Sequence, residues 1–400
     1  MANTSSRTGR DVLVLSAVRT AIGKYGGSLK DVPPTDLAAH VVREAVKRAD
    51  VEPAAVGHVV FGNVIHTEGR DMYLARVAAL NGGLPQSTPA LTVNRLCGSG
   101  LQAVVSAAQT LTLDEAEVAV AGGAESMSRA QYWLPDQRWG QRMGNGRTVD
   151  AMIAALTDPF DSVHMGVTAE NIASRWQISR EDQDALAVQS HRRAAAAAAQ
   201  GRFKEQIVPF EIKGRKGTTV IEADEHVRPD VSIEDLARLR PAFAKDGTVT
   251  AGNASGVNDA AAAVVLATRD AAAARGAEPM GRLIAYSHVA VDPRYMGIGP
   301  VPAVGALLER TGLALDQIDV FEVNEAFAAQ ALAVSRDLGL PDEKTNPNGS
   351  GVGLGHPIGA TGAILVVKAL HELARSGGRY AVVTMCIGGG QGIAALFERE

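Results

Sequence analysis

The sequence is poor in cysteine, in aromatic residues and in unbalanced charge. It holds two cysteines, 4% aromatic residues, and 39 basic against 44 acidic residues, for a net charge of −5. Two cysteines are too few for a disulfide scaffold, and a reducing compartment would keep both as thiols. Without a basic excess we expect neither a nucleic acid nor an anionic membrane as a partner.

Membrane and targeting signals are missing as well. No apolar run approaches the ~18 residues that a membrane-spanning helix needs. The polar start of the chain leads straight into a strand-like run, which is not the layout of a signal peptide. The last four residues, FERE, are not a peroxisomal address. We therefore expect a cytoplasmic protein.

Apolar residues and glycine are abundant instead. The chain is 46% hydrophobic and contains 42 glycines, which is typical of a globular protein with closely packed helices and sheets. Its 400 residues predict two or three domains. Strand-like runs at 12–18, 57–64 and 116–124 alternate with amphipathic helical runs at 36–49 and 100–111. This alternation predicts a layered α/β fold.

Three elements of the first half recur in the second half at one fixed spacing of 262 residues. The matched pairs are Gly62 with Asn324, Gly100 with Gly362, and Val118 with Tyr380. We interpret this as an internal duplication, with two similar α/β halves packed as a pseudo-dimer. A functional site is then expected between the halves, where strand ends from both converge.

The duplication suggests domain boundaries. We expect a first half made of residues 1–126 plus 253–278, an inserted segment at 127–252 that covers the site, and a second half at 279–400. The insert begins with an irregular, exposed stretch that carries Trp133 and Trp139. It also contains a helix with Ser179 as its N-cap and Gly201 just past its end.

One cysteine lies where a nucleophile is commonly presented. In "LTVNRLCGSGLQAVVSAAQTL" a strand ends, Cys97 follows, and a helix begins after two glycines. The N-terminus of a helix favours a thiolate, and glycine lets a ligand approach the backbone. The layout resembles the strand–elbow–helix of hydrolases, although not in its G-x-S-x-G form. A small buried core cysteine is the alternative.

Three further polar residues lie in glycine-rich or strand-end positions. His356 precedes the helix that matches the helix after Cys97, so the two could form a Cys–His pair, although a lone loop histidine is more often incidental. Asn324 ends a strand and could hold a water, orient an imidazole or cap a helix. Cys386 stands where the matching strand has Ala124, next to the turn "CIGGGQG".

Other kinds of site fit these residues less well. Zinc would need closer ligand spacing or more cysteines. The glycine-rich turn after Cys386 lacks the Lys-Ser/Thr of a phosphate-binding Walker loop. A Cys–His protease would leave Cys386 without a role.

The motifs together resemble the thiolase family over nearly the full length of the chain. "NRLCGSG", "NEAFA", "GHPIGATG" and "CIGGGQG" follow the order and spacing of that family, while "HMGVTAEN" and "GNASGVNDAAAA" match its acyl-CoA-binding segments. The chain resembles most closely the bacterial biosynthetic β-ketothiolases, including those that supply polyhydroxyalkanoate synthesis. The resemblance implies a duplicated α/β/α/β/α layered fold with an inserted loop domain.

The resemblance also implies catalytic roles. Cys97 would carry the acyl group as a thioester after His356 removes its proton. His356 and a water held by Asn324 would form one oxyanion hole. The N–H groups of Cys97 and Gly388 would form the other. Cys386 would remove or return the α-proton of the second acyl-CoA.

The resemblance further implies a channel for coenzyme A. Its lining would consist of His164, Met165, Arg228, Phe243, Ala251, Ser255, Met296, Ala326 and Phe327. Acyl-CoA and CoA would be the partners, with no metal or redox cofactor, in a homotetramer joined partly through the loop near 127–145. Two residues depart from the family's pattern: Ser350, in a stretch that often reads N-x-N-G-G-A, and Asp235, which would repel the nucleotide phosphate if it faced it.

The chemistry of a Claisen condensation agrees with these residues. It needs a nucleophile that is also a good leaving group, a base for an acidified Cα–H, and donors for charge on two different oxygens. A thiol whose pKa is lowered by a helix end and an imidazole would serve. We expect a reversible, ping-pong condensation of two acyl-CoA molecules to 3-ketoacyl-CoA and CoA. The alternatives are a degradative thiolase of β-oxidation, a decarboxylating ketoacyl synthase, which uses no second cysteine, and a non-catalytic acyl-CoA-binding protein.

Overall fold

A computed structural model of the chain describes residues 11–215 and 217–400. The polar start of the chain lies outside these residues. One large mixed sheet runs through the molecule in the order β12-β13-β14-β11-β1-β10-β5-β3-β4, with β2 beside β10. Its strands are β1 (Val12–Arg19), β2 (Gly23–Lys24), β3 (His58–Gly62), β4 (Ala90–Val93), β5 (Val118–Ser126), β10 (Asn258–Thr268), β11 (Gly281–Ala290), β12 (Val320–Val323), β13 (Tyr380–Ile387) and β14 (Gln391–Glu398).

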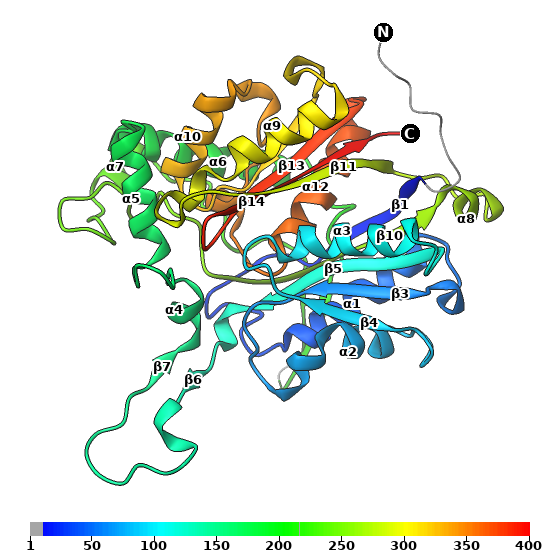
Figure 1. The fold of residues 1–400 in the computed structure, drawn as a ribbon, viewed down its shortest axis with the longest axis horizontal. Coiled ribbons are helices and arrows are strands. Elements are labelled where there is room, and N and C mark those ends of the chain that lie inside the picture. Colours follow the sequence, from blue (N-terminus) through cyan, green and yellow to red (C-terminus); the bar gives the residue numbers. More distant parts are fainter. Residues whose placement is uncertain (1–10, 216) are drawn as a thin grey trace.

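Helices lie on the outer side of each half of the sheet and between the two halves, which gives five layers in all. α3 packs against β3 and β5, α12 packs against β12 and β13, and the two helices contact each other between the halves (Figure 1). α1 covers the outer side of the first half, and α9 covers that of the second. The predicted α/β/α/β/α layering is therefore confirmed. The helices of the two halves are α1 (Pro34–Arg48), α2 (Leu74–Asn81), α3 (Ser99–Thr112), α8 (Arg269–Ala274), α9 (Pro300–Thr311), α10 (Ala328–Leu338), α11 (Gly351–Leu354) and α12 (Thr361–Ser376).

The strand register confirms the duplication. β3 pairs with β5 in parallel so that His58 lies opposite Ala119, and β12 pairs with β13 so that Val320 lies opposite Ala381. Both members of the second pair follow those of the first by 262 residues. The helices α3 and α12 begin at positions that differ by the same spacing. The five predicted elements of the first half are also present, with ends that differ by one or two residues.

Two matched glycines bring the two central helices close together. A Cβ on Gly100 would lie 2.7 Å from the backbone nitrogen of Ala363, and a Cβ on Gly362 would clash with the backbone nitrogen of Leu101. Only glycine allows two backbones to approach in this way. The contact lies in the first turn of both helices. It therefore brings the turn before α3, with Cys97, next to the turn before α12, with His356.

The strands at the centre of the sheet are buried on both faces. All eleven residues of β10 and all nine of β5 are buried, and small or β-branched apolar residues make up most of both strands. Continuous apolar runs of this kind are expected where helices cover both sides of a sheet. The core is thus continuous across the first half and reaches α12.

The segment between β5 and β10 extends beyond the two halves. It contains α4 (Ala151–Ala155), α5 (Met165–Arg175), α6 (Arg180–Ala199), α7 (Ile233–Ala237), β6 (Tyr132–Trp133), β7 (Val149–Asp150), β8 (Phe210–Gly214) and β9 (Gly217–Ile221). Ser179 caps α6, where its Oγ accepts from the Asp182 N–H at 3.0 Å, and Gly201 follows its end in the left-handed region, as predicted. The domain boundaries themselves stay a prediction.

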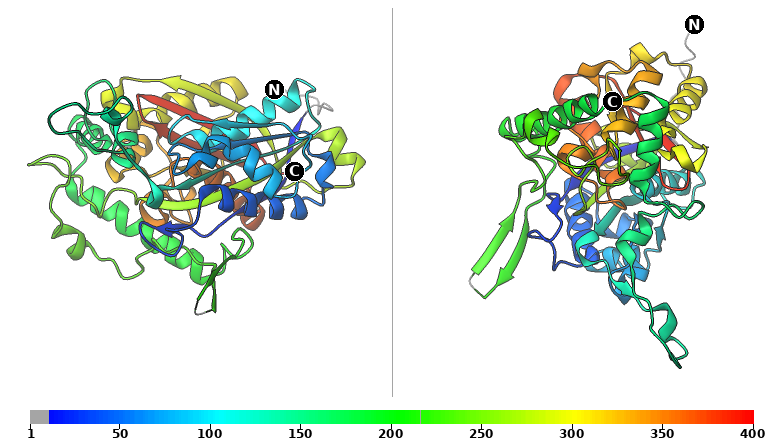
Figure 2. Two further views of the ribbon diagram at one scale, coloured as in Figure 1. Left: turned by 90° about the horizontal axis from the view of Figure 1, so that it is seen from below. Right: turned by 90° about the vertical axis from the view of Figure 1, so that its left-hand side faces the viewer.

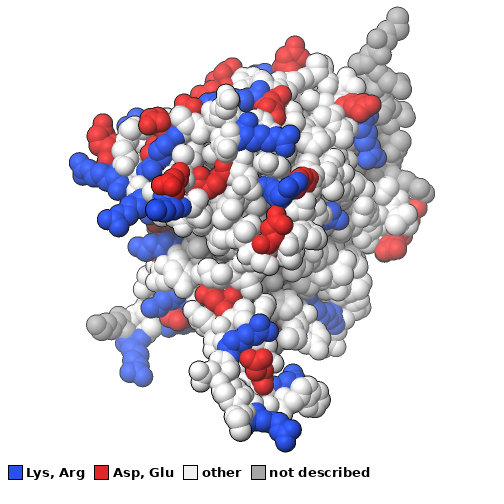
Figure 3. Space-filling model, turned by 60° about the vertical axis from the view of Figure 1, so that its left-hand side comes forward, with Lys and Arg blue, Asp and Glu red and all other residues white. Residues whose placement is uncertain are grey.

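Two projections leave the body of the molecule. An arm around β6 and β7 and the β8–β9 hairpin both extend outward (Figure 2). The arm exposes large apolar side chains, with Trp139 93% and Met143 94% exposed. Acidic and basic side chains lie interspersed over the face in Figure 3. No helix within the described ranges is both long and apolar enough to cross a membrane.

Candidate active site

A tight turn presents Cys97 between β4 and α3. Leu96 lies in the left-handed region with φ of 46°, a conformation that costs a β- or γ-branched residue free energy. Ser99 stabilises the turn, since its Oγ donates to the Leu96 carbonyl at 2.6 Å and accepts from the Arg95 N–H at 2.8 Å. The Cys97 side chain is half-buried and faces a pocket. The predicted nucleophile elbow is thus present.

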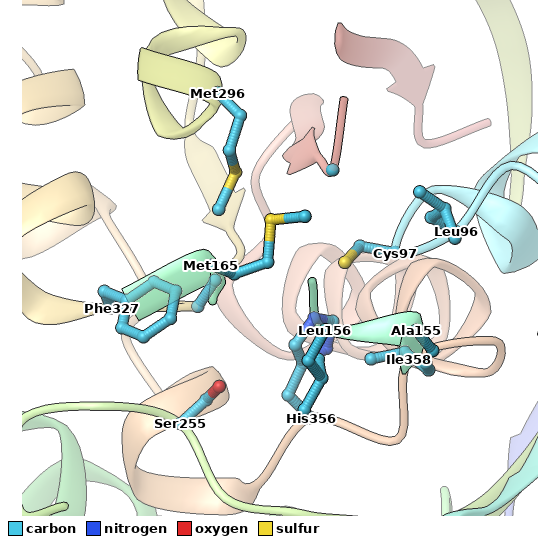
Figure 4. Close-up of a pocket in the computed structure, with 12 residues that line it drawn as sticks. Leu96, Cys97, Ala155, Leu156, Met165, Ser255, Met296, Phe327, His356 and Ile358 are labelled. Atoms are coloured by element: carbon cyan, nitrogen blue, oxygen red, sulfur yellow. The ribbon is translucent and has the colours of Figure 1, made fainter. Parts of the chain in front are cut away.

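The pocket draws its walls from both halves and from the insert (Figure 4). It is narrow, about 50 Å³, and mostly apolar. A single water needs roughly 10–15 Å³ measured in this way, so the space fits a few small groups. The lining residues are Leu96, Cys97, Ala155, Leu156, Met165, Ser255, Met296, Ala326, Phe327, His356, Ile358 and Gly388.

Hydrogen bonds fix the tautomer of His356. Its Nδ1 lies 2.7 Å from Thr361 Oγ1, and that hydroxyl lies 2.9 Å from the Pro357 carbonyl. A carbonyl can only accept, so the single hydroxyl proton goes to Pro357 and the oxygen accepts from Nδ1–H. Nε2 is then the nitrogen without a proton. Burial lowers the pKa of His356 to about 4, which keeps the ring neutral and Nε2 ready to accept a proton at pH 7.

Asn324 lies directly beside this nitrogen. It follows the last residue of β12, and its Nδ2 is 3.4 Å from His356 Nε2. Its Oδ1 is buried without a hydrogen-bond partner. Phe327 occupies the N-cap position of α10, so the helix-cap alternative for Asn324 is wrong. A buried amide with an unused acceptor suits a site for a bound water or a substrate oxygen.

Cys386 lies behind the pocket wall. It is fully buried in β13 opposite Gly392 of β14 and packs with Met165, Met296 and Phe327. The pKa of its thiol is raised, mainly by burial and also by charge on Cys97. The two thiols are therefore close enough to interact electrostatically.

The expected lowering of the thiol pKa values is wrong. Burial raises the pKa of Cys97 to about 11, although the N–H groups of Gly388 and Cys97 itself, which point at its sulfur, act in the opposite direction. Loss of solvation outweighs these donors. The resting pair is accordingly a neutral thiol and a neutral imidazole, and the role of His356 as the acceptor of the thiol proton stays a prediction.

The glycine turn after Cys386 brings its backbone to the pocket, which Gly388 lines. A Cβ on Gly388 would lie 3.1 Å from Met165 Cε and 3.2 Å from Leu96 Cδ1, closer than most such contacts. Gly389 and Gly390 have φ of 79° and 80°, which favour glycine. The N–H groups of Cys97 and Gly388 both point at the Cys97 sulfur, and their role as oxyanion donors stays a prediction.

Most of the predicted channel residues meet at this pocket. Five of them line it: Met165, Ser255, Met296, Ala326 and Phe327. His164 stacks on Phe243 with ring centroids 4.7 Å apart, and Phe243 meets Phe327 edge-on. Arg228 and Ala251 are exposed and outside the lining, so their contact with a ligand stays a prediction.

The two departures from the family pattern have local explanations. Asp235 accepts from Ser232 Oγ at 2.7 Å and completes the N-terminal capping box of α7. Ser350 is buried and donates to the Val323 carbonyl at 2.9 Å, one residue before Asn324. Neither lines the pocket.

Some pocket residues were not foreseen. Leu96 and Ile358 stand inside the quoted motifs next to Cys97 and His356, so the motifs themselves carried a signal for them. Ala155 and Leu156, at the end of α4, had none. Among the described residues no group of three or more His, Cys, Asp or Glu could hold a metal ion.

Two family models match the sequence along nearly its whole length. "Thiolase, N-terminal domain" matches residues 12–270, and "Thiolase, C-terminal domain" matches residues 277–399. The chain belongs to the thiolase family. The predicted enzyme class, an acyltransferase of the thiolase type, is confirmed with it.

Relatives of this thiolase cover it from end to end. The beta-ketothiolase BktB of Cupriavidus necator is 64% identical over 391 residues, which are 98% of this chain and 99% of that one. The crystal structure of human mitochondrial 3-ketoacyl-CoA thiolase superposes with a TM-score of 0.96 at 46% identity, covering 98% of this chain and 100% of that one. The same human enzyme in complex with CoA gives 0.95 at 45% identity, covering 98% of each chain. The predicted fold is confirmed.

Proposed function

We propose that this thiolase is a biosynthetic β-ketothiolase, which joins acetyl-CoA to a second short acyl-CoA and also runs the reverse thiolysis. The observation that carries the proposal is the neutral pair of the Cys97 thiol and the unprotonated His356 Nε2 in one pocket with a second thiol behind it. The 64% identity to an enzyme named beta-ketothiolase supports this reaction.

The first half-reaction makes the acyl-enzyme. The Cys97 sulfur attacks the thioester carbonyl of the first acyl-CoA while His356 Nε2 takes the thiol proton. The negative charge on the carbonyl oxygen is stabilised by the N–H groups of Cys97 and Gly388. The C–S bond to CoA breaks, and the departing CoA thiolate takes the proton of Cys386. An S-acyl-Cys97, an imidazolium and a Cys386 thiolate remain.

Acylation changes the electrostatics around Cys386. A thioester on Cys97 cannot carry the negative charge that contributes to the raised pKa of Cys386. The imidazolium formed on His356 adds positive charge to the same pocket, which favours a thiolate. The base is therefore produced at the step that needs it.

The second half-reaction forms the new carbon–carbon bond. The Cys386 thiolate removes the α-proton of the second acyl-CoA, and its enolate oxygen lies with Asn324, through a water, and His356. The enolate carbon attacks the Cys97 thioester, the C–S bond to Cys97 breaks, and His356 returns its proton to Cys97. All three groups regain their starting protonation, so the cycle needs no metal or redox cofactor.

The second candidate is a degradative thiolase of β-oxidation, since the chain is 46% identical to the human 3-ketoacyl-CoA thiolase. The preferred acyl chain length of the substrate distinguishes the two candidates. The narrow pocket favours short acyl groups. The test is the rate of thiolysis of acetoacetyl-, 3-ketovaleryl- and 3-ketohexadecanoyl-CoA. We expect the two short substrates to be faster, as a supply of polyhydroxyalkanoate precursors would require. A preference for the longest one would favour the degradative function.

Assembly and location complete the proposal. The exposed apolar residues of the arm around β6 and β7, including Trp139, support a homotetramer joined through the arm. Light scattering of the wild type and of a variant with a shortened arm tests it, and a monomeric wild type would contradict it. Acyl-CoA and CoA are the expected partners, in the cytoplasm, where both cysteines stay reduced.

A further inference from the structure

The duplication leaves a second copy of the pocket framework in the first half. At the spacing of 262 residues, Cys97 of the pocket corresponds to Gly359, and Ala326 and Phe327 correspond to Val64 and Ile65. We call the place around these corresponding residues the twin site. It lies beside the active pocket, because Gly359 directly follows Ile358, which lines that pocket.

A single carboxylate fills the twin site. Glu125 Oε2 accepts from the N–H groups of Gly359 at 2.8 Å and Val64 at 3.1 Å, and Oε1 accepts from that of Ile65 at 3.1 Å. Asn63 Nδ2 adds a fourth donor at 3.2 Å. Glu125 is fully buried. The backbone donor that the active pocket offers to a substrate oxygen, at Cys97, is thus taken in the twin site by the protein's own carboxylate.

The four donors suit an ionised carboxylate. Two donors approach each oxygen, so every lone pair is used, and a protonated carboxyl would turn its O–H toward a donor. Burial raises the pKa of Glu125 to about 8, against the three N–H groups that oppose the rise, so the carboxylate is mostly ionised only above that pH. The corresponding position in the second half is Ile387, an apolar core residue, so no carboxylate competes with substrate in the active pocket.

Glu125 also connects the two walls of the active pocket. Gly359 is three residues beyond His356, in the turn whose other end is fixed by the bond from the His356 N–H to Asn258 Oδ1 at 2.9 Å. Val64 and Ile65 pack with Ile358 in one apolar cluster that Cys97 also joins. The charge of Glu125 reaches Cys97, where it raises the pKa of the thiol. Glu125 therefore connects the loop at Val64 and Ile65 to the turn that carries His356.

We propose that Glu125 is a positioning residue for His356, which holds the turn before α12 through the Gly359 N–H and so sets the reach of the imidazole to Cys97. This inference rests on the proposed function, in which His356 takes the Cys97 proton. Without the carboxylate, three buried N–H groups lose their acceptor and the turn relaxes. A shift of about 1 Å in a catalytic group is enough to cost about 100-fold in rate.

The test compares Glu125→Ala and Glu125→Gln with a matched control. The control is Glu225→Ala, which removes another carboxylate that accepts backbone N–H groups, those of Lys24 and Ser28, and that is not part of the pocket lining. Thiolysis of acetoacetyl-CoA is measured per active site, and sites are counted by iodoacetamide labelling of Cys97 and mass spectrometry. Formate, a free carboxylate, is then added to each variant.

We expect kcat per labelled site to fall about 100-fold in Glu125→Ala, with the KM for CoA within about twofold. Formate should restore kcat about tenfold or more in Glu125→Ala, since it can occupy the emptied cavity, and not in Glu125→Gln, whose amide fills it. Glu225→Ala should retain the wild-type kcat. If Glu125→Ala does not fold, kcat per labelled site in Glu125→Gln decides, with a loss of about tenfold or more expected.

Two outcomes would overturn the inference. One is a wild-type kcat per labelled site in the Glu125 variants. The other is formate that raises the melting temperature of Glu125→Ala and leaves its kcat low, which would make Glu125 a purely structural residue. A wild-type enzyme without thiolysis activity would instead contradict the proposed function, so the two failures are distinguishable.

Discussion

The two halves of the molecule share one frame and differ in nearly every group that does chemistry. Each candidate catalytic residue has a different residue at the matching position 262 residues away. The pairs are Cys97 with Gly359, His356 with Asn94, Asn324 with Gly62, Cys386 with Ala124, and Gly388 with Ser126. At each of these matched positions one half of the frame forms without the candidate catalytic residue, so the fold does not require it there. Each catalytic group therefore occurs at only one of two matched positions, which is best explained by function.

The first residue of each central helix shows how a shared group acquires two tasks. Ser99 and Thr361 are counterparts, and both use a hydroxyl to bond a backbone carbonyl of the preceding turn. Ser99 only fixes the elbow that presents Cys97. Thr361 also accepts from His356 Nδ1 and so determines which imidazole nitrogen is the base. A frame residue has thus become part of the catalytic arrangement.

The largest effect is expected from removal of the nucleophile. Cys97→Ala should lose on the order of 10⁴-fold or more in thiolysis, because no other group in the pocket can form the thioester. Isotopically labelled acetyl-CoA should leave no label on the protein. The control is CoA affinity measured by calorimetry, which should stay close to the wild type. Acyl-enzyme formation in this variant would show that another residue is the nucleophile.

Replacing His356 by its counterpart tests the difference between the halves more sharply. His356→Asn installs the residue found at position 94, and kcat should fall about 10³-fold, since general base catalysis contributes 10²- to 10⁴-fold. Alkylation of Cys97 by iodoacetamide at pH 7 should slow as well, because the thiol loses its proton acceptor. An unchanged alkylation rate would show that His356 does not accept the proton of Cys97.

Replacement of Thr361 should have an intermediate effect on kcat, and a serine variant at the same position serves as the control. Thr361→Val keeps the shape and removes the acceptor of Nδ1–H, so the wrong tautomer becomes accessible and kcat should fall about 10-fold or more. Thr361→Ser restores the hydroxyl and should recover most of the activity. The expected change lies in kcat, with KM little affected. Equal losses of kcat in the Thr361→Val and Thr361→Ser variants would show that the Thr361 hydroxyl does not fix the tautomer of His356.

The matched glycines should respond alike, because they belong to the shared frame. Gly100→Ala and Gly362→Ala each force a Cβ into the backbone of the opposite helix, and overpacking of this kind costs about 1–3 kcal/mol of unfolding free energy. Denaturant unfolding of both variants measures it, with Gly305→Ala as a control at a helical glycine that has no close neighbour. Destabilisation of only one variant would break the equivalence of the halves.

The chemically distinctive site residues could be predicted from the sequence. The features that depend on how the folded chain packs over the site and excludes water could not. Thiols, an imidazole and an amide next to glycine turns are visible in the letters, and so is the spacing of the duplication. Ala155 and Leu156 are ordinary aliphatic residues of the insert, and only folding brings them to the pocket. The direction of the Cys97 pKa was also missed, because a helix end can be read from sequence and the loss of solvent around the thiol cannot.

The division of roles between the two thiols is tested by Cys386→Ala, which gives β13 the residue that its counterpart β5 has at Ala124. The variant is mixed with labelled acetyl-CoA, and label on Cys97 and acetoacetyl-CoA formation are followed together. We expect a folded protein that still acquires label on Cys97, because CoA can leave as its thiolate, and that condenses about 10³-fold more slowly, because the second half-reaction has lost its α-proton base. Equal loss of both steps would contradict the division of roles between the two thiols.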